Sequence, residues 1–348
     1  MKAVRIEQAI GHRLACDVTG VTPTAVRSVV TKGTVIEEEH LSALRDAGHV
    51  LIYIDESDES VPTQDLVDEG PASLAIAQSL SGSHLLSKGV DAGKTFLFAN
   101  ADGLLRVDPD ICRYVNDSDI ALLITKPPFS VVRMHELVAV VDLIPLTVSA
   151  SRLSAMIEQI GTMGAAVDVA PFAPAAVSLL ITGTEVYEGR IPDAVAPVVE
   201  DKVARYGGKL QAVQFVPDDE DRIASSVKAM AQCHDVVIVT GGMSVDPTDR
   251  TPAAIGRVAD TIVKYGIPLL PTAMSMVARR GSTTILGISA GLVYYRSANI
   301  LDRLLPLVFA GEPVTREYLV HMGAGGLMPE FIADVEGKQH RARGGVAG

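Results

Sequence analysis

The chain has 348 residues, more than one hydrophobic core normally serves, so its length predicts two or more domains. Hydrophobic residues make up 48% and charged residues 21%, which is typical of a folded globular protein and excludes a disordered one. The formal net charge of -12 argues against nucleic acid or an anionic membrane as partner. Because the first residues lack the apolar run of a signal peptide, we expect a cytoplasmic protein.

Residues 1–60 are expected to form a small N-terminal unit. A helix is predicted over residues 37–47, with Gly48 ending it, and residues 50–54 read as a strand. The acidic run at residues 55–60 suits a solvated linker.

Residues 61–172 are expected to form a mixed α/β segment. Helices are predicted over residues 66–80, with a break at Gly70 and Pro71, and over residues 154–164, and strands over 95–99 and 120–124. Residues 89–95 resemble a phosphate-binding P-loop, but an apolar strand pattern follows where a P-loop needs a helix. A hairpin turn is therefore the favoured interpretation.

Residues 175–311 alternate strands with helices. Predicted strands cover residues 177–182, 210–216, 235–240 and 284–288, and predicted helices cover 195–206, 220–232, 252–259 and 299–307. This alternation predicts an α/β fold, a three-layer α/β/α domain with a mostly parallel sheet, preceded by the smaller mixed α/β N-terminal region. Residues 312–348 are expected to be a C-terminal tail with a disordered, glycine-rich end.

The most informative stretch is the apolar run at residues 236–239, which ends in Gly241 and Gly242. Glycines leave backbone N–H groups open to an anion, because no Cβ blocks close approach. Thr251 as N-cap and Pro252 as first helical residue predict a helix whose N-terminus faces the same place. That geometry suits a phosphate.

Three loops follow predicted parallel strands and should converge at one sheet edge, where ligands bind in this architecture. They combine glycines, hydroxyls and carboxylates, and a hard cation such as Mg²⁺ would reconcile the carboxylates with a bound phosphate. For Asp219 and Glu220, helix capping is an equally good explanation. The residues that we assign to the site are Thr182, Gly183, Glu185, Asp193, Asp218, Gly241, Gly242, Ser244 and Asp249.

The residues of these three loops, in this order and spacing, resemble the motifs of the molybdopterin-binding domain family of molybdenum-cofactor biosynthesis, the MoaB/Mog-like domains. The resemblance implies a pterin-binding homo-oligomer in which Asp218 and Asp249 are the catalytic residues and hold Mg²⁺, while the remaining seven residues bind molybdopterin. The N-terminal pattern also resembles molybdopterin molybdotransferases, in its Ala9, Gly11, Leu14, Ala15 and Asp17.

Two departures from the family pattern bear on catalysis. Thr272 stands where the family has a glycine, and Ser289 with Ala290 replaces part of a second proline-glycine loop. A Cβ at residue 272 would obstruct a backbone approach to phosphate.

Three functions therefore remain open. The resemblance implies an enzyme that transfers an adenylyl group from ATP to molybdopterin or inserts molybdate into it. The departures favour a non-catalytic molybdopterin carrier or sensor. The same motifs also occur in nucleotide-processing proteins of the competence-damage type, which would make a nucleotide the ligand.

Overall fold

The computed structural model describes residues 2–22, 25–55, 65–90, 93–244, 246 and 249–344. The chain divides into two compact units. The first comprises Met1–Ala99, Val107–Lys126 and His135–Asp168, and the second comprises Asn100–Arg106, Pro127–Met134 and Val169–Gly348. The acidic run expected to be a linker lies outside the described residues, apart from Asp55.

The N-terminal part of the first unit has its own small core, formed by Ile6, Leu14, Ile36 and Leu44 among others. Its elements are β1 (Lys2–Arg5), η1 (Ile6–Gln8), β2 (Val18–Thr22), β3 (Ala25–Val30), α1 (Glu38–Asp46) and β4 (Leu51–Ile54). Strand β1 pairs with β4 and β2 with β3, both antiparallel. The predicted helix and strand are confirmed, and Gly48 has the positive φ, 84°, of a helix-ending glycine.

The rest of the first unit is built on an antiparallel sheet in the order β6-β7-β11-β9. Its elements are β5 (Leu66–Asp68), α2 (Glu69–Leu80), β6 (Leu85–Val90), β7 (Lys94–Ala99), α3 (Pro109–Asn116), β9 (Ala121–Thr125), β11 (Leu137–Leu143), β12 (Thr147–Ser149) and α4 (Ala150–Met163). Antiparallel pairing of β6 with β7 confirms the hairpin over the P-loop.

One helix prediction in this segment is wrong at its start. Residues 66–68 form strand β5, which pairs with β12, and helix α2 begins only at Glu69. Gly70 and Pro71 therefore lie in the first turn of the helix and do not break it. Proline is accepted there because the first helical N–H groups have no intrahelical partner.

The second unit contains a six-stranded sheet in the order β15-β14-β16-β19-β18-β17. The first three pairings are parallel and the last two antiparallel, so the sheet is mostly parallel, as predicted. Its elements are β14 (Ala176–Thr182), α5 (Thr184–Tyr187), α6 (Ala196–Ala204), β15 (Lys209–Val216), α7 (Glu220–Met230), β16 (Val236–Thr240), α8 (Thr251–Val258), β17 (Thr261–Tyr265), β18 (Met276–Arg280), β19 (Thr283–Ile288) and α9 (Leu301–Phe309). A separate sheet, β10-β8-β13, comprises β8 (Gly103–Val107), β10 (Val131–Val132) and β13 (Val167–Pro171).

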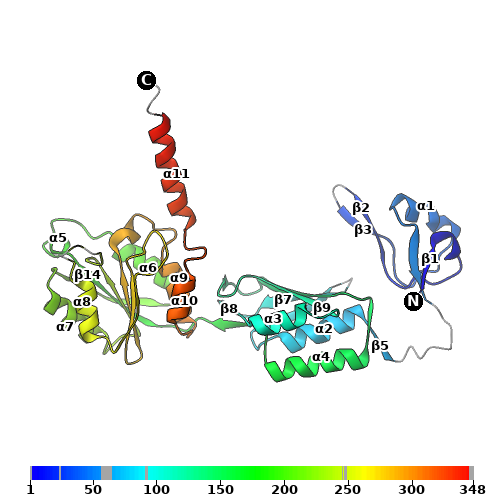
Figure 1. The fold of residues 1–348 in the computed structure, drawn as a ribbon, viewed down its shortest axis with the longest axis horizontal. Coiled ribbons are helices and arrows are strands. Elements are labelled where there is room, and N and C mark those ends of the chain that lie inside the picture. The colour runs from blue at the N-terminus through cyan, green and yellow to red at the C-terminus, as the bar shows by residue number, and fades with distance from the viewer. Residues whose placement is uncertain are drawn as a thin grey trace. The chain divides into compact units, whose positions relative to one another are not determined.

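Both faces of this sheet are covered by helices (Figure 1). Along β16, Val236 and Ile238 join the core under α6 and α9, whereas Val237 and Val239 join the core under α7 and α8. A strand buried on both faces is uniformly apolar, and this explains the uninterrupted β-branched run in the sequence. The three-layer α/β/α prediction is confirmed for this domain.

Two features of the second unit have no counterpart in the sequence prediction. The antiparallel hairpin of β17 and β18 extends the parallel sheet. Beyond residue 312 the chain forms α10 (Arg316–His321) and α11 (Pro329–Gly344), and the last four residues lie outside the described part. None of the described helices is long and apolar enough to cross a membrane.

A buried ion pair joins α6 to α9. The Lys202 side chain is fully buried, and its Nζ donates to both carboxylate oxygens of Asp302, at 2.8 and 2.6 Å. The Asp302 carboxylate also accepts the N–H of Asn299 at 2.8 Å. Full burial of a charged lysine requires such a partner, because an unpaired charge in the core is strongly unfavourable.

Candidate functional site

Three strand ends are level with one another at the carboxyl edge of the parallel sheet. Thr182 of β14 is in register with Val216 of β15, and Ile181 is in register with Thr240 of β16. Thr182 ends β14, and the segments after these three strands carry the other eight predicted site residues, so the fold brings them toward one edge.

Asp218 joins the first loop, which follows β14, to the second loop, which follows β15. Its Oδ2 accepts the backbone N–H of Thr184 at 3.0 Å and the Thr184 hydroxyl at 3.3 Å. The N–H of Asp218 in turn donates to Thr184 Oγ1 at 3.3 Å. The carboxylate is therefore already engaged in holding the short helix α5 against the end of β15.

The third loop, which follows β16, packs on the loop after β14 through Gly241. A Cβ at this position would lie 2.2 Å from the carbonyl oxygen of Thr182, and the φ of 99° also favours glycine. The absence of a side chain is thus required by contact between two loops. This contact is a reason for glycine that the sequence did not reveal, and the approach of a ligand to Gly241 stays a prediction.

Thr251 is not the N-cap of α8, contrary to our prediction. The capping position is Arg250, and Thr251 is the first helical residue, followed by Pro252. Its hydroxyl donates to the carbonyl of Gly241 at 2.8 Å and lies 3.2 Å from the hydroxyl of Thr182. The side chain is buried among the loops, and it stabilises the loop instead of the helix end.

Asp249 closes the third loop on itself. Its Oδ2 accepts the backbone N–H of Ser244 at 2.6 Å, a charge-assisted hydrogen bond. The phenol of Tyr265 donates to the carbonyl of Met243 at 2.9 Å in the same loop. Burial raises the pKa of Tyr265, and the negative charge of Asp249 raises it further. The phenol therefore stays protonated and keeps donating.

The remaining predicted residues divide into exposed and structural ones. Asp193 lies two residues before Val195, the N-cap of α6, and its Oδ1 accepts the N–H of Val195 at 2.8 Å. Glu185 is exposed, and its carboxylate lies over the buried Gly183, whose φ is 140°. Glu185 is thus available to a ligand, whereas Asp193 already has a structural partner.

Thr240 is a candidate site residue that the sequence did not single out. Its side chain is 1% exposed, and Oγ1 has no hydrogen-bond partner among the described residues. A buried hydroxyl without a partner is unfavourable, which makes Thr240 a candidate to bond to a ligand at this strand end. The only available signal was a hydroxyl at the last position of an otherwise apolar strand.

The carboxylates at this edge do not by themselves make a metal site. Among the described residues, no three His, Cys, Asp or Glu side chains form a group that could hold a metal ion. Asp218 and Asp249 also each accept a backbone N–H. Mg²⁺ would fit here only with oxygens from a bound phosphate completing its shell, as is common for this ion.

Thr272 does not obstruct the edge as the sequence suggested. Its side chain is fully buried, and its Oγ1 accepts the N–H of Ile300 at 3.2 Å. Its carbonyl accepts the Ser275 hydroxyl at 2.7 Å. The residue thus supports the segment leading into α9, and its methyl group does not face solvent. Ser289 precedes the short helix η3 (Ala290–Val293).

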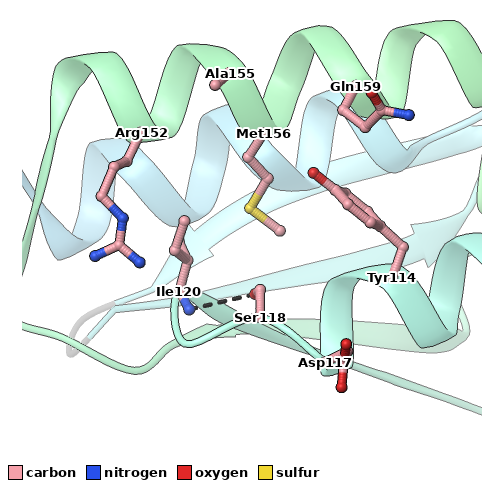
Figure 2. A pocket seen from close by; sticks show the side chains of 8 residues that line it. All are labelled: Tyr114, Asp117, Ser118, Ile120, Arg152, Ala155, Met156 and Gln159. Atoms are coloured by element: carbon pink, nitrogen blue, oxygen red, sulfur yellow. Dashed lines mark hydrogen bonds between the residues drawn. The ribbon is translucent and has the colours of Figure 1, made fainter.

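A separate groove of about 490 Å³ lies between α3 and α4 in the first unit (Figure 2). Arg152 and Met156 of α4 point toward Ile120, and Tyr114 comes from α3 on the other side. Ile120 donates its N–H to the Ser118 hydroxyl at 3.3 Å. None of the predicted site residues lines this groove.

Comparison with known proteins finds matches for the N-terminal part and for the C-terminal domain. A family model described as a probable molybdopterin binding domain matches residues 178–306, and a domain of unknown function matches residues 3–56. A CinA-like protein of Citrifermentans bemidjiense is 36% identical over 85 residues, which are 24% of this chain and 20% of that protein. The chain thus spans about a fifth of the curated relatives of this kind.

Solved structures of molybdenum-cofactor proteins also match. The molybdopterin biosynthesis enzyme MoaB of Thermus thermophilus is 22% identical, with a TM-score of 0.35, and the match covers 40% of this chain and 98% of that one. The molybdopterin biosynthesis Mog protein of Mycobacterium ulcerans is 21% identical, with a TM-score of 0.33, 38% coverage of this chain and 93% of that one. The family match is confined to residues 178–306, and it supports a molybdopterin-binding domain in that part of the chain.

Proposed function

We propose that residues 178–306 bind molybdopterin at the carboxyl edge of the parallel sheet, as part of molybdenum-cofactor biosynthesis. The observation that carries the proposal is the joining of three loops at that edge. Asp218 ties the first loop to the second, and Gly241 packs the third on the first. The unpaired hydroxyl of Thr240 lies where these loops begin, ready to accept or donate a hydrogen bond.

The chemistry that we propose is adenylyl transfer to molybdopterin, or molybdate insertion into the adenylylated form, with ATP and Mg²⁺ as co-substrate and cofactor. Asp218, Asp249 and Glu185 would repel a phosphate if no cation intervened. When bound, Mg²⁺ would offset the charge of the phosphate oxygens. The chain's own residues orient the ligand, because both aspartates hold loop backbones in place.

Two measurements test the proposal. Mass spectrometry of the small molecules that co-purify with the protein should find a pterin. Incubation with molybdopterin, ATP and Mg²⁺, and then of the adenylylated form with molybdate, should give product in at least one step. Binding without product in either step would reject the enzyme and leave a carrier or sensor. No pterin binding would reject the proposal as a whole.

The carrier or sensor is the second candidate, although the structure removes one reason for it. Thr272 supported the carrier or sensor because its Cβ was expected to obstruct the approach of a phosphate. That side chain is buried, and its hydroxyl accepts the N–H of Ile300. A third candidate is nucleotide processing, which is favoured by the CinA-like names of the curated relatives. Retention of a nucleotide instead of a pterin by the purified protein would favour this third function.

The proposal includes a homo-oligomer. Strand β15 lies at the outer edge of the sheet, and its Val213 and Phe215 are exposed by 41% and 36%. An antiparallel pairing of this edge with a second copy would place Lys209 near the acidic residues after β15, such as Asp219. Light scattering after size exclusion would detect the oligomer.

Cell fractionation tests the cytoplasmic location expected from the sequence.

A further inference from the structure

A second unassigned cavity lies in the second unit, away from the strand ends. It has a volume of about 260 Å³ and is formed by the turn at Phe129, by Leu269 and by helices α9 and α10. Its charged and polar side chains are Arg303, Tyr318 and His321. No aspartate or glutamate lines it, although the chain carries 42 of them and a net charge of -12. The cavity is therefore a local exception to the acidic character of the protein.

Phe129 adopts a backbone conformation that is unfavourable for its residue type. Its φ is 60°, and it occupies the third position of a turn in which Ser130 N–H donates to the carbonyl of Pro127 at 3.2 Å. This position normally takes glycine or asparagine. The aromatic ring packs edge-on against Tyr318, with centroids 5.3 Å apart and planes at 80°. The strained backbone thus holds an aromatic ring, 39% exposed, at the wall of the cavity.

Two donors at the cavity have no acceptor within the described part of the chain. The Arg303 guanidinium makes no hydrogen bond or ion pair there, since only its backbone N–H is bonded, to Ile300. The Tyr318 hydroxyl is likewise unbonded, while its backbone N–H donates to Thr315. Burial raises the pKa of the Tyr318 phenol, and the positive charge of Arg303 opposes this only in part. The phenol therefore remains a donor at neutral pH.

Apolar side chains form part of the cavity lining beside these donors. Leu269 is almost fully buried, and Pro128, Met322 and Ala324 complete the wall with Phe129. The volume is slightly below the range of 300 to 1,000 Å³ that is usual for drug-sized ligands, so the occupant must be small. A cation and a hydroxyl donor beside an apolar, aromatic wall match a small molecule with one anionic end and an apolar body.

We propose that this cavity binds a small organic monocarboxylate, with its carboxylate between Arg303 and Tyr318 and its apolar body against Phe129 and Leu269. A bidentate contact from the planar guanidinium would supply most of the recognition. This site lies on different elements from the molybdopterin site and does not depend on the function proposed there.

Binding is measured by calorimetry on the full chain, with benzoate and hexanoate as probes and benzamide as the uncharged control. We expect at least one carboxylate to bind below about 10 mM and benzamide to bind at least ~10-fold more weakly. Arg303→Met, which keeps the apolar stem, should weaken carboxylate binding by ~10-fold or more. Arg316→Met removes a positive charge from α10 outside the cavity lining, so this variant is the control and should leave binding unchanged.

Tyr318→Phe and Phe129→Gly separate binding from folding. Tyr318→Phe keeps the ring and should weaken binding by a smaller factor, ~3-fold to 10-fold. Phe129→Gly relieves the positive φ, so the protein should remain folded by thermal unfolding while carboxylate binding falls. Absence of carboxylate binding to the wild type, equal binding of benzamide, or unchanged binding by a folded Arg303→Met variant would each overturn the proposal.

Discussion

The carbonyl oxygen of Thr182 occupies the space that a side chain at residue 241 would need. The Cβ of any other residue at Gly241 would lie 2.2 Å from it. The loop after β16 can therefore reach the loop after β14 only because this residue is glycine. Contact between these loops, together with the Thr251 hydroxyl that bonds to the Gly241 carbonyl, sets the shape of the candidate site.

Gly241→Ala should lower the free energy of unfolding by about 2 to 4 kcal/mol, from backbone strain at φ 99° and from the clash with Thr182. Gly207→Ala is the matched control, because Gly207 has a φ of 78° and nothing within 4 Å of its Cβ position. That variant should cost only about 1 to 2 kcal/mol. Equal losses for the two variants in urea unfolding would show that the clash contributes nothing.

Gly242→Val should lose ligand binding and stability together. Its φ is 53°, so a β-branched residue there is strained, and its Cβ would lie 3.1 Å from the Thr251 hydroxyl. Loss of ligand binding in this variant would therefore be accompanied by loss of stability of about 1 to 3 kcal/mol. Thermal unfolding checks this, and wild-type stability together with lost binding would support a purely ligand-facing role for Gly242.

Asp249→Asn should lower adenylyl transfer by ~10² or more with little change in affinity, if the negative charge of Asp249 holds Mg²⁺ at the transferring group. The asparagine oxygen can still accept the Ser244 N–H, so the loop should keep its shape. Asp260→Asn is the matched control, since Asp260 also accepts a backbone N–H, from Gly281 at 2.7 Å. Similar rate losses in both variants would point to a general effect on folding.

Asp302→Asn should destabilise the second unit by about 3 kcal/mol, because it leaves the fully buried Lys202 without a counter-charge. The double variant with Lys202→Met should recover much of this loss, since both charges are then gone. Asp201→Asn, in an exposed pair with Arg205, should cost less than about 1 kcal/mol. Denaturant unfolding of the four proteins distinguishes these cases, and a mild Asp302→Asn variant would contradict the prediction.

Stability should fall above about pH 10, partly through Tyr206. Burial raises the pKa of its phenol, and the negative charge of Asp302 adds to this. The unfolded chain loses this proton near the ordinary value of 10.0, whereas the folded chain keeps it to higher pH. The contribution of Tyr206 to the free energy of unfolding is thus fully present below that value and is lost as pH rises through the pKa of the folded state.

Tyr206→Phe should make the fall in stability between about pH 9 and 11 less steep. Tyr294→Phe is the control, because Tyr294 is 83% exposed. Urea unfolding at a series of pH values gives both slopes. An unchanged slope for Tyr206→Phe would rule out this residue as a source of alkaline unfolding.

The local sequence pattern determined the α/β/α fold of the C-terminal domain. The apolar run of β16 and the helices on either side of it could be predicted because a doubly covered parallel strand is uniformly apolar and its connections are helical. The convergence of loops followed from the same topology. Residues such as Asp218 and Asp249 could be selected because they follow the carboxyl ends of strands.

Tertiary structure decided what those residues do. Asp218 and Asp193 accept backbone N–H groups, Thr251 bonds to a loop instead of capping a helix, and Thr272 is turned into the core. The roles of Asp218 and Thr272 do not follow from spacing, because their partners Thr184 and Ile300 belong to distant segments of the chain. The hairpin of β17 and β18 was equally hidden, since pairing at a sheet edge depends on the neighbouring strand more than on local propensity.

The sequence by itself therefore determined the alternation of strands and helices in the C-terminal domain and its resemblance to molybdopterin-binding domains, because hydrophobic periodicity and loop motifs are local properties. Only the tertiary structure decided the burial of the Lys202 pair, the unpaired hydroxyl of Thr240 and the cavity beside Phe129. These three features arise where segments far apart in the chain meet. The free energy of each depends on which polar and apolar groups are buried together.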